Sequence, residues 1–138
     1  MTKRTIASFI LAALPLAASA QQACPELPPG AGLHWEQQAG AGFRVCRAVD
    51  AGGRQVFGVM LTREPTVQLQ RRNREEEAVI AGREVHWYRP DIAVDTGLEK
   101  RITVVELEED RYAQIWVDAP DATQLRQAMA LAEGIALN

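Results

Sequence analysis

Residues 101–135 read RITVVELEEDRYAQIWVDAPDATQLRQAMALAEGI, and this stretch decides the fold. Residues 102–107 and 112–117 are rich in the residues that favour strands, and the acidic run 108–110 between them predicts a hairpin. In the second strand Ala113, Ile115 and Val117 fall on one face, whereas Tyr112 and Trp116 fall on the other. One face of the predicted sheet is therefore aliphatic, and the opposite face carries aromatic rings.

A helix is expected directly after this hairpin. Asp121 can cap its first turn, and Gln124 stands three residues later, which is the spacing of a capping box. The apolar residues that follow recur at helical spacing: Leu125, Ala128, Met129, Ala132 and Ile135. This apolar stripe should lie across the sheet on the face of Ala113, Ile115 and Val117.

Further hairpins are predicted upstream. Residues 43–48 and 56–61 flank the glycine-rich turn 50–53, and residues 78–80 and 85–89 flank the turn 81–83. Gly58, inside one of these strands, indicates a bulge or a close approach of another group to the backbone. His34 and Trp35 should begin a short strand. Residues 66–77 fit either a helix or an exposed strand followed by a charged turn at Asn73, and we favour the strand.

The order of these elements predicts an α+β fold. We expect an antiparallel sheet of about five to seven strands built from hairpins, with one long C-terminal helix packed on one face. Over the last fifty or so residues this order resembles the Mog1/PsbP-type α+β fold, whose chains also end with a strand followed by a sheet-packing helix. The resemblance implies an α+β sandwich as the alternative architecture, and it assigns a role to no residue.

The N-terminus has the layout of a secretory signal peptide. Lys3 and Arg4 precede an apolar run over residues 6–17, and small residues at 18–20 suit a signal peptidase. The run is shorter than the roughly 20 residues that a bilayer span needs. We predict cleavage after Ala20, a single domain over residues 21–138 with an irregular leader at 21–42, and a location in the periplasm or outside the cell.

Cleavage would also change the chemistry of the chain. It would leave thirteen basic residues against eighteen acidic ones, a formal charge of −5, which does not favour nucleic acid or anionic membranes but suits a basic protein partner. It would also remove Ser8 and Ser19, the only serines, so no serine nucleophile would remain. No insertion into the membrane is expected after cleavage.

The two cysteines, Cys24 and Cys46, are expected to form a disulfide in an oxidising compartment. The bridge would tie the leader to the first strong strand. His34 and His86 lie far apart in the sequence, and neither belongs to a metal-binding spacing. We therefore predict no metal, no cofactor and no catalytic residue.

A candidate partner-binding surface comes from the aromatic face of the predicted sheet. It comprises Tyr88, His86, Glu106, Glu108, Tyr112 and Trp116. Aromatic rings among charged side chains are typical of protein interfaces. Two interpretations remain open: an exposed binding face, or a second small core under the leader or under residues 91–100.

The sequence thus suggests a small exported protein that binds another exported protein and is not an enzyme. Our leading hypothesis is an inhibitor or immunity protein directed against a toxin or a cell-wall hydrolase. An accessory subunit of an envelope or secretion system is the main alternative. A third alternative is an enzyme that uses carboxylates or a metal, for which Glu84, His86, Glu106 and Glu108 are the candidate groups.

Overall fold

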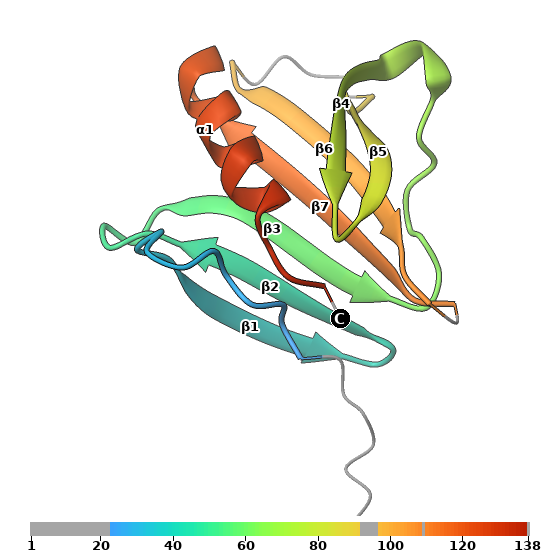
Figure 1. Cartoon of the computed structure of the whole chain (residues 1–138), viewed down its shortest axis with the longest axis horizontal. Coiled ribbons are helices and arrows are strands. Elements are labelled where there is room, and N and C mark those ends of the chain that lie inside the picture. The colour runs from blue at the N-terminus through green and yellow to red at the C-terminus, as the bar shows by residue number, and fades with distance from the viewer. Residues whose placement is uncertain (1–22, 92–96, 109, 138) are drawn as a thin grey trace, which may run out of the picture.

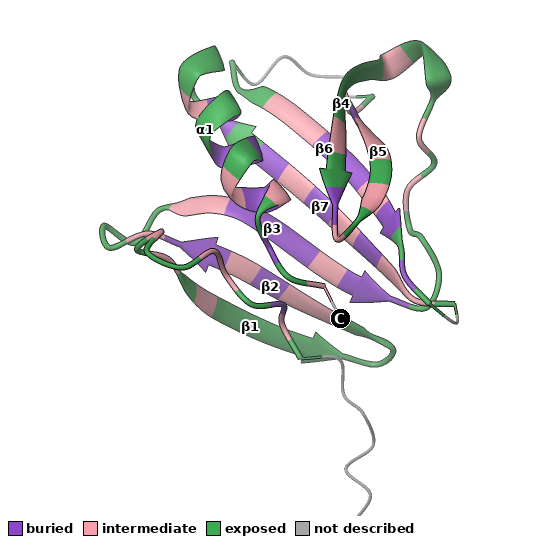
Figure 2. Cartoon of the chain, viewed as in Figure 1, coloured by how far each residue is buried: buried purple, intermediate pink, exposed green. Residues whose placement is uncertain are grey.

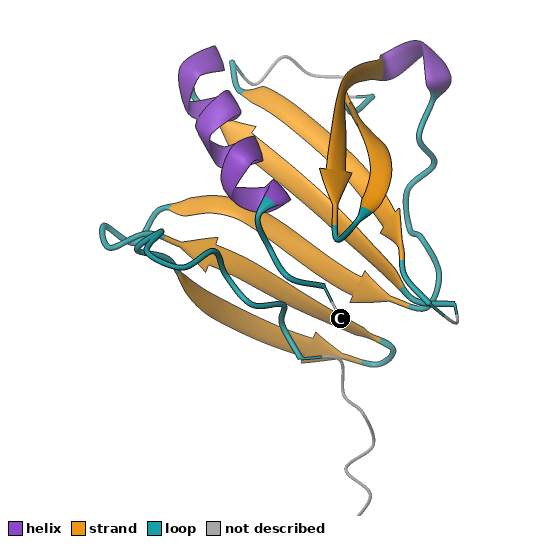
Figure 3. Ribbon diagram, in the orientation of Figure 1, coloured by secondary structure: helices purple, strands orange, loops and turns teal. Residues whose placement is uncertain are grey.

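The computed structural model describes residues 23–91, 97–108 and 110–137 (Figure 1). In this part of the chain seven antiparallel strands form one sheet with a C-terminal helix packed on it, which confirms the predicted fold class (Figure 3). The elements are β1 His34–Gly40, β2 Phe43–Val49, β3 Gln55–Thr62, the short 3₁₀ helix η1 Arg71–Asn73, β4 Arg74–Ile80, β5 Arg83–Tyr88, β6 Glu99–Glu106, β7 Tyr112–Ala119 and α1 Ala122–Glu133. The predicted signal peptide lies outside the described residues.

The last strand of the chain lies in the middle of the sheet. The strand order is β1-β2-β3-β7-β6-β5-β4, so β7 joins the N-terminal strands to the later hairpin. Strands β5 and β6 share only the register pair Tyr88–Ile102. Beyond this pair the β4–β5 hairpin bends toward the helix (Figure 1), where Trp87 Nε1 donates to Glu133 Oε1 at 2.9 Å.

Helix α1 covers one side of the sheet, which we call the inner face. Asp121 accepts a hydrogen bond from the Gln124 backbone N–H at 2.7 Å, so the predicted cap is confirmed. The predicted apolar stripe is buried along its length: Leu125, Ala128, Met129, Ala132 and Ile135. The strands contribute fully buried side chains to the same core, among them Phe57, Val59, Trp87, Ile115 and Val117 (Figure 2).

The predicted disulfide between Cys24 and Cys46 is present, and Cys46 is completely buried in the inner core. Trp35 Nε1 donates to the Pro25 carbonyl at 2.7 Å, and Ala136 N donates to the Glu26 carbonyl at 3.1 Å. The leader is therefore fixed on the inner side, beside the C-terminal end of α1. The disulfide also indicates an oxidising environment outside the cytoplasm.

Several predicted boundaries are wrong. Strands β4 and β6 begin earlier than expected, at Arg74 and Glu99, and β6 ends at Glu106. Residues 66–70 form no strand, because the connection from β3 to β4 leaves the middle of the sheet for its far edge and finds no unpaired neighbour on the way. The charged turn at Asn73 is confirmed as η1, and β4 begins directly after it. Strand β1 is longer than predicted, because its pairing with β2 continues through Gln37 and Gln38 to Gly40. Among the described residues, no helix has the length and apolar character needed to cross a bilayer.

Candidate functional site

The face of the sheet opposite α1, which we call the outer face, carries most of the residues singled out from the sequence. Residues directly opposite each other in an antiparallel pair lie on the same face. The register of the strands therefore aligns one row across all seven of them: Glu36, Arg47, Gly58, Trp116, Ile102, Tyr88 and Arg74. Trp116 stands at the centre of this row because β7 is the central strand.

Trp116 lies directly over the backbone of β3. A Cβ atom placed on Gly58 would overlap the indole ring, so only glycine leaves room for the tryptophan here. The close approach suggested by Gly58 in the sequence is confirmed, and the β2–β3 register shifts instead between Ala48 and Val49. Gly58 thus allows the Trp116 indole to pack on the outer face of β3.

The centre of the row is apolar and its outer end is charged. Ile102 is 8% exposed and lies between two half-buried aromatic residues, Trp116 and Tyr88. The Arg74 guanidinium lies 6.0 Å from the centre of the Tyr88 ring, and its Nη2 donates to the tyrosine hydroxyl at 3.4 Å. Such contacts orient the tyrosine without burying it.

A second and a third row extend this surface. Met60, Gln114 and Val104 are opposite one another on β3, β7 and β6. The third row is Phe43, Thr62, Tyr112 and Glu106. Phe43 is 42% exposed and Glu106 is exposed, so this end of the face is the more open one.

His86 lies on the same side of β5 as Tyr88, next to the edge strand β4. Its Nε2 stands 3.4 Å from Glu77 Oε1 on β4, and the imidazole is half-buried. The structure thus brings five of the predicted residues to the outer face: Tyr88, His86, Glu106, Tyr112 and Trp116. Glu108 lies beyond the end of β6 in the connection to β7, so it is not part of the sheet surface.

The predicted alternative that the leader covers this face is wrong, because the leader packs on the inner side. The connection from β3 to β4 reaches the outer face instead, where Thr66 Oγ1 donates to Gln114 Oε1 at 2.8 Å. Within the loop expected over residues 91–100, residues 92–96 lie outside the described residues. Phe43 and Met60 were missed, because nothing local in the sequence indicates that β3 pairs with β7. Arg74 was missed because β4 was expected to begin only at residue 78.

The charges on the two faces differ in their arrangement. On the outer face Glu36, Glu84 and Glu106 are exposed at its margins. On the inner face Arg101, whose side chain is only 11% exposed, donates from Nε to Glu76 Oε1 at 2.7 Å. Burial raises the pKa of Glu76, but the hydrogen bond and charge of Arg101, with smaller contributions from a backbone hydrogen bond and Arg89, lower it below its ordinary value.

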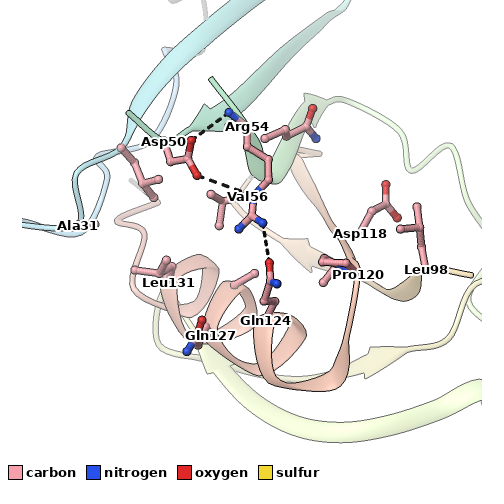
Figure 4. A pocket seen from close by; sticks show the side chains of 14 residues that line it. Ala31, Asp50, Arg54, Val56, Leu98, Asp118, Pro120, Gln124, Gln127 and Leu131 are labelled. Atoms are coloured by element: carbon pink, nitrogen blue, oxygen red, sulfur yellow. Dashed lines mark hydrogen bonds and ion pairs between the residues drawn. The ribbon is translucent and has the colours of Figure 1, made fainter. Parts of the chain in front are cut away.

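A separate cleft of about 460 Å³ lies between the first half of α1, the β2–β3 turn and the end of β7 (Figure 4). Its lining is mostly apolar, and its charged groups, Asp50, Arg54 and Asp118, already have partners. Asp50 accepts from the backbone N–H of Gly52 and Arg54, Arg54 Nη1 donates to Gln124 Oε1, and Asp118 pairs with Lys100 at 2.8 Å. These contacts hold the turn against the helix and leave no unpaired charge to select a ligand.

The residues considered for enzyme chemistry are not brought together by the sheet register. Strands β5 and β6 separate beyond Tyr88–Ile102, so Glu84 and His86 have no register partner on β6, where Glu106 lies. Within residues 23–91, 97–108 and 110–137, no group of three or more potential metal-ligating side chains was found. The outer face carries aromatic surface, hydrogen-bonding side chains and charged residues of both signs at its margins.

No protein family, curated protein or solved structure matches this chain, so the functional argument rests on its own residues.

Proposed function

We propose that this chain is an exported, non-enzymatic protein whose outer sheet face binds another exported protein. The observation that carries the proposal is the row at the centre of the outer face, in which Trp116 and Tyr88 flank Ile102. The two aromatic residues are only half-buried, although Ile115 and Val117, on the opposite face of β7, are completely buried. Aromatic side chains in such a setting supply most of the binding energy at many protein interfaces.

The charge at the margins supports a basic partner. The formal charge of the whole chain is −3, and on the outer face the exposed residues Glu36, Glu77, Glu84 and Glu106 outnumber the two arginines of the row, Arg47 and Arg74. Complementary charge around an apolar centre speeds association and selects the partner. A secreted toxin or a cell-wall hydrolase with a basic surface fits this description, and the chain would act as its inhibitor or immunity protein in the periplasm.

The proposal can be tested by quantitative capture from an envelope extract. The disulfide-bonded protein serves as bait, alongside a variant with Tyr88→Ala and Tyr112→Ala. A matched control carries Arg126→Ala and Gln127→Ala, two exposed positions on the solvent side of α1. We expect one partner to be retained by the wild type and the helix control but reduced at least tenfold with the outer-face variant.

Equal capture by all three baits, or no partner above background, would refute the proposal. A captured enzyme would then be assayed with increasing amounts of the chain. Stoichiometric loss of its activity supports the inhibitor role, whereas unchanged activity and co-purification with other envelope proteins supports the accessory-subunit alternative.

A further inference from the structure

The two edges of the sheet are protected to very different degrees. An edge strand offers unpaired N–H and C=O groups, and proteins usually guard it with charges, bulges or proline. Strand β4 has such protection, because it carries Arg74 and three consecutive glutamates, and its register with β5 shifts between Arg74 and Glu77. Side chains of this kind prevent pairing with another strand.

Strand β1 has almost none of these features. Its sequence is HWEQQAG, with Glu36 as the only acidic or basic residue besides His34, no proline, and an unbroken register with β2. Five of its seven residues in succession, residues 36–40, are exposed. Within the part of the chain that the structure describes, β1 pairs with β2 alone, so its outer edge is open.

The sequence of β1 is complementary to itself. When two copies pair antiparallel about a two-fold axis at Gln37, all seven residues find a partner. His34 then faces Gly40, Trp35 faces Ala39, and Glu36 faces Gln38 of the other copy. A like-charge pair is absent from this register, whereas an axis at Glu36 would set two glutamates against each other. In β4 an axis at Glu76 or Glu77 would do the same.

An exposed aromatic ring borders this edge. Phe43 lies over Gly40, because a Cβ atom on Gly40 would overlap the phenyl ring. Phe43 is also one of the few large apolar residues left exposed in the described part of the chain. In the self-paired register Gly40 faces His34 of the second copy, so the ring would be covered by that strand.

We propose that β1 is a homodimerisation edge, where two copies of the chain pair antiparallel about Gln37 to form one continuous sheet. This goes beyond the proposed function, because the aromatic residues Trp116 and Tyr88 at the centre of the outer face lie away from β1 and remain open on both copies. The interface is short, so we expect a dissociation constant in the micromolar range, on the order of 1–100 μM.

The test is sedimentation velocity of the disulfide-bonded protein from about 1 to 500 μM. Gln38→Glu sets a carboxylate against Glu36 of the other copy twice per dimer, and we expect it to weaken dimerisation on the order of tenfold. Gln38→Lys forms two opposite-charge pairs instead and should strengthen it. Gln68→Glu makes the same charge change at an exposed position away from the edge and should leave the dissociation constant unchanged.

If adding Glu36→Lys to Gln38→Glu restores the dissociation constant of the wild type, the two positions face each other and the register is established. A protein that stays monomeric up to 500 μM overturns the proposal. So does a dimer that responds equally to Gln38→Glu and Gln68→Glu, since its interface would then lie elsewhere. Circular dichroism of each variant separates a lost interface from a lost fold.

Discussion

The two faces of the sheet differ in how far their side chains are buried, although both are formed by the same strands. On the inner face, Ile115 and its neighbours are fully enclosed by α1 and the disulfide-linked leader. On the outer face, Trp116 alternates with Ile115 along the same strand yet is only half-buried. The inner face therefore forms the closed core, whereas the aromatic residues of the outer face keep part of their surface accessible to solvent.

The largest effect on stability should come from replacing an isoleucine by alanine on the inner face, compared with the same replacement on the outer face. Ile115→Ala leaves a cavity in the closed inner core, and we expect it to lower the free energy of unfolding by about 4 kcal/mol. Ile102→Ala, on the outer face, should cost about 2 kcal/mol, because a single layer of side chains can relax around the gap. Urea denaturation measures both. Equal losses would show that the outer face is a second closed core.

The disulfide should have the next largest effect, because it holds the leader on the inner face. Replacing both Cys24 and Cys46 by alanine frees a loop with a sequence separation of 22 residues, and we expect a loss of about 3 kcal/mol. Binding through the outer face should persist in conditions where the variant is folded. A variant that is as stable as the wild type would contradict the role given to the leader.

Gly58→Ala tests the outer face itself. The new methyl group would collide with the Trp116 indole, and the resulting shift should cost about 2 kcal/mol. Gly52→Ala is the control, because a Cβ atom there meets only Asp50 Oδ1 at 3.4 Å. Denaturation followed by tryptophan fluorescence reports both stability and the position of the ring. An unchanged spectrum in the Gly58 variant would show that Trp116 does not lie over this glycine.

The smallest effect concerns the ion pair between Glu76 and Arg101. Because the pKa of Glu76 is lowered on folding, its contribution is complete above the ordinary value of 4.5 and is lost as the pH falls through the folded-state value. Glu76→Gln should therefore reduce stability near neutral pH, by a few tenths to about 1 kcal/mol, and the loss should vanish in acid. Glu84→Gln provides an exposed control with the same change in charge. If the stability lost in Glu76→Gln increased as the pH fell, the ion pair between Glu76 and Arg101 would not be its cause.

The sequence predicted the features that depend on neighbouring residues. The cap at Asp121, the hairpin turns and the close approach at Gly58 each follow from local chemistry, and each is confirmed. The strand order could not be predicted, because the insertion of β7 between β3 and β6 depends on contacts across the whole sheet. The same limit explains why residues 66–70 were wrongly expected to form a strand: alternation of Val67 and Leu69 suits a strand, but no partner strand is there.

The sequence likewise predicted some residues of the outer face and missed others. Alternation along β7 placed Tyr112 and Trp116 on the face away from the helix, as the structure has them. Phe43 and Met60 were missed because they join this surface only through pairing between strands distant in sequence. Glu108 was included because it continues the alternation of β6, but the strand ends at Glu106.

The claim that the outer face binds a partner is tested most directly by photo-crosslinking in cells. A benzoylphenylalanine at Tyr112 probes the outer face, and one at Arg126 probes the exposed side of α1. We predict a discrete adduct of higher mass from the Tyr112 position and none from the Arg126 position. Adducts from the helix position alone, or the same adducts from both positions, would contradict the account.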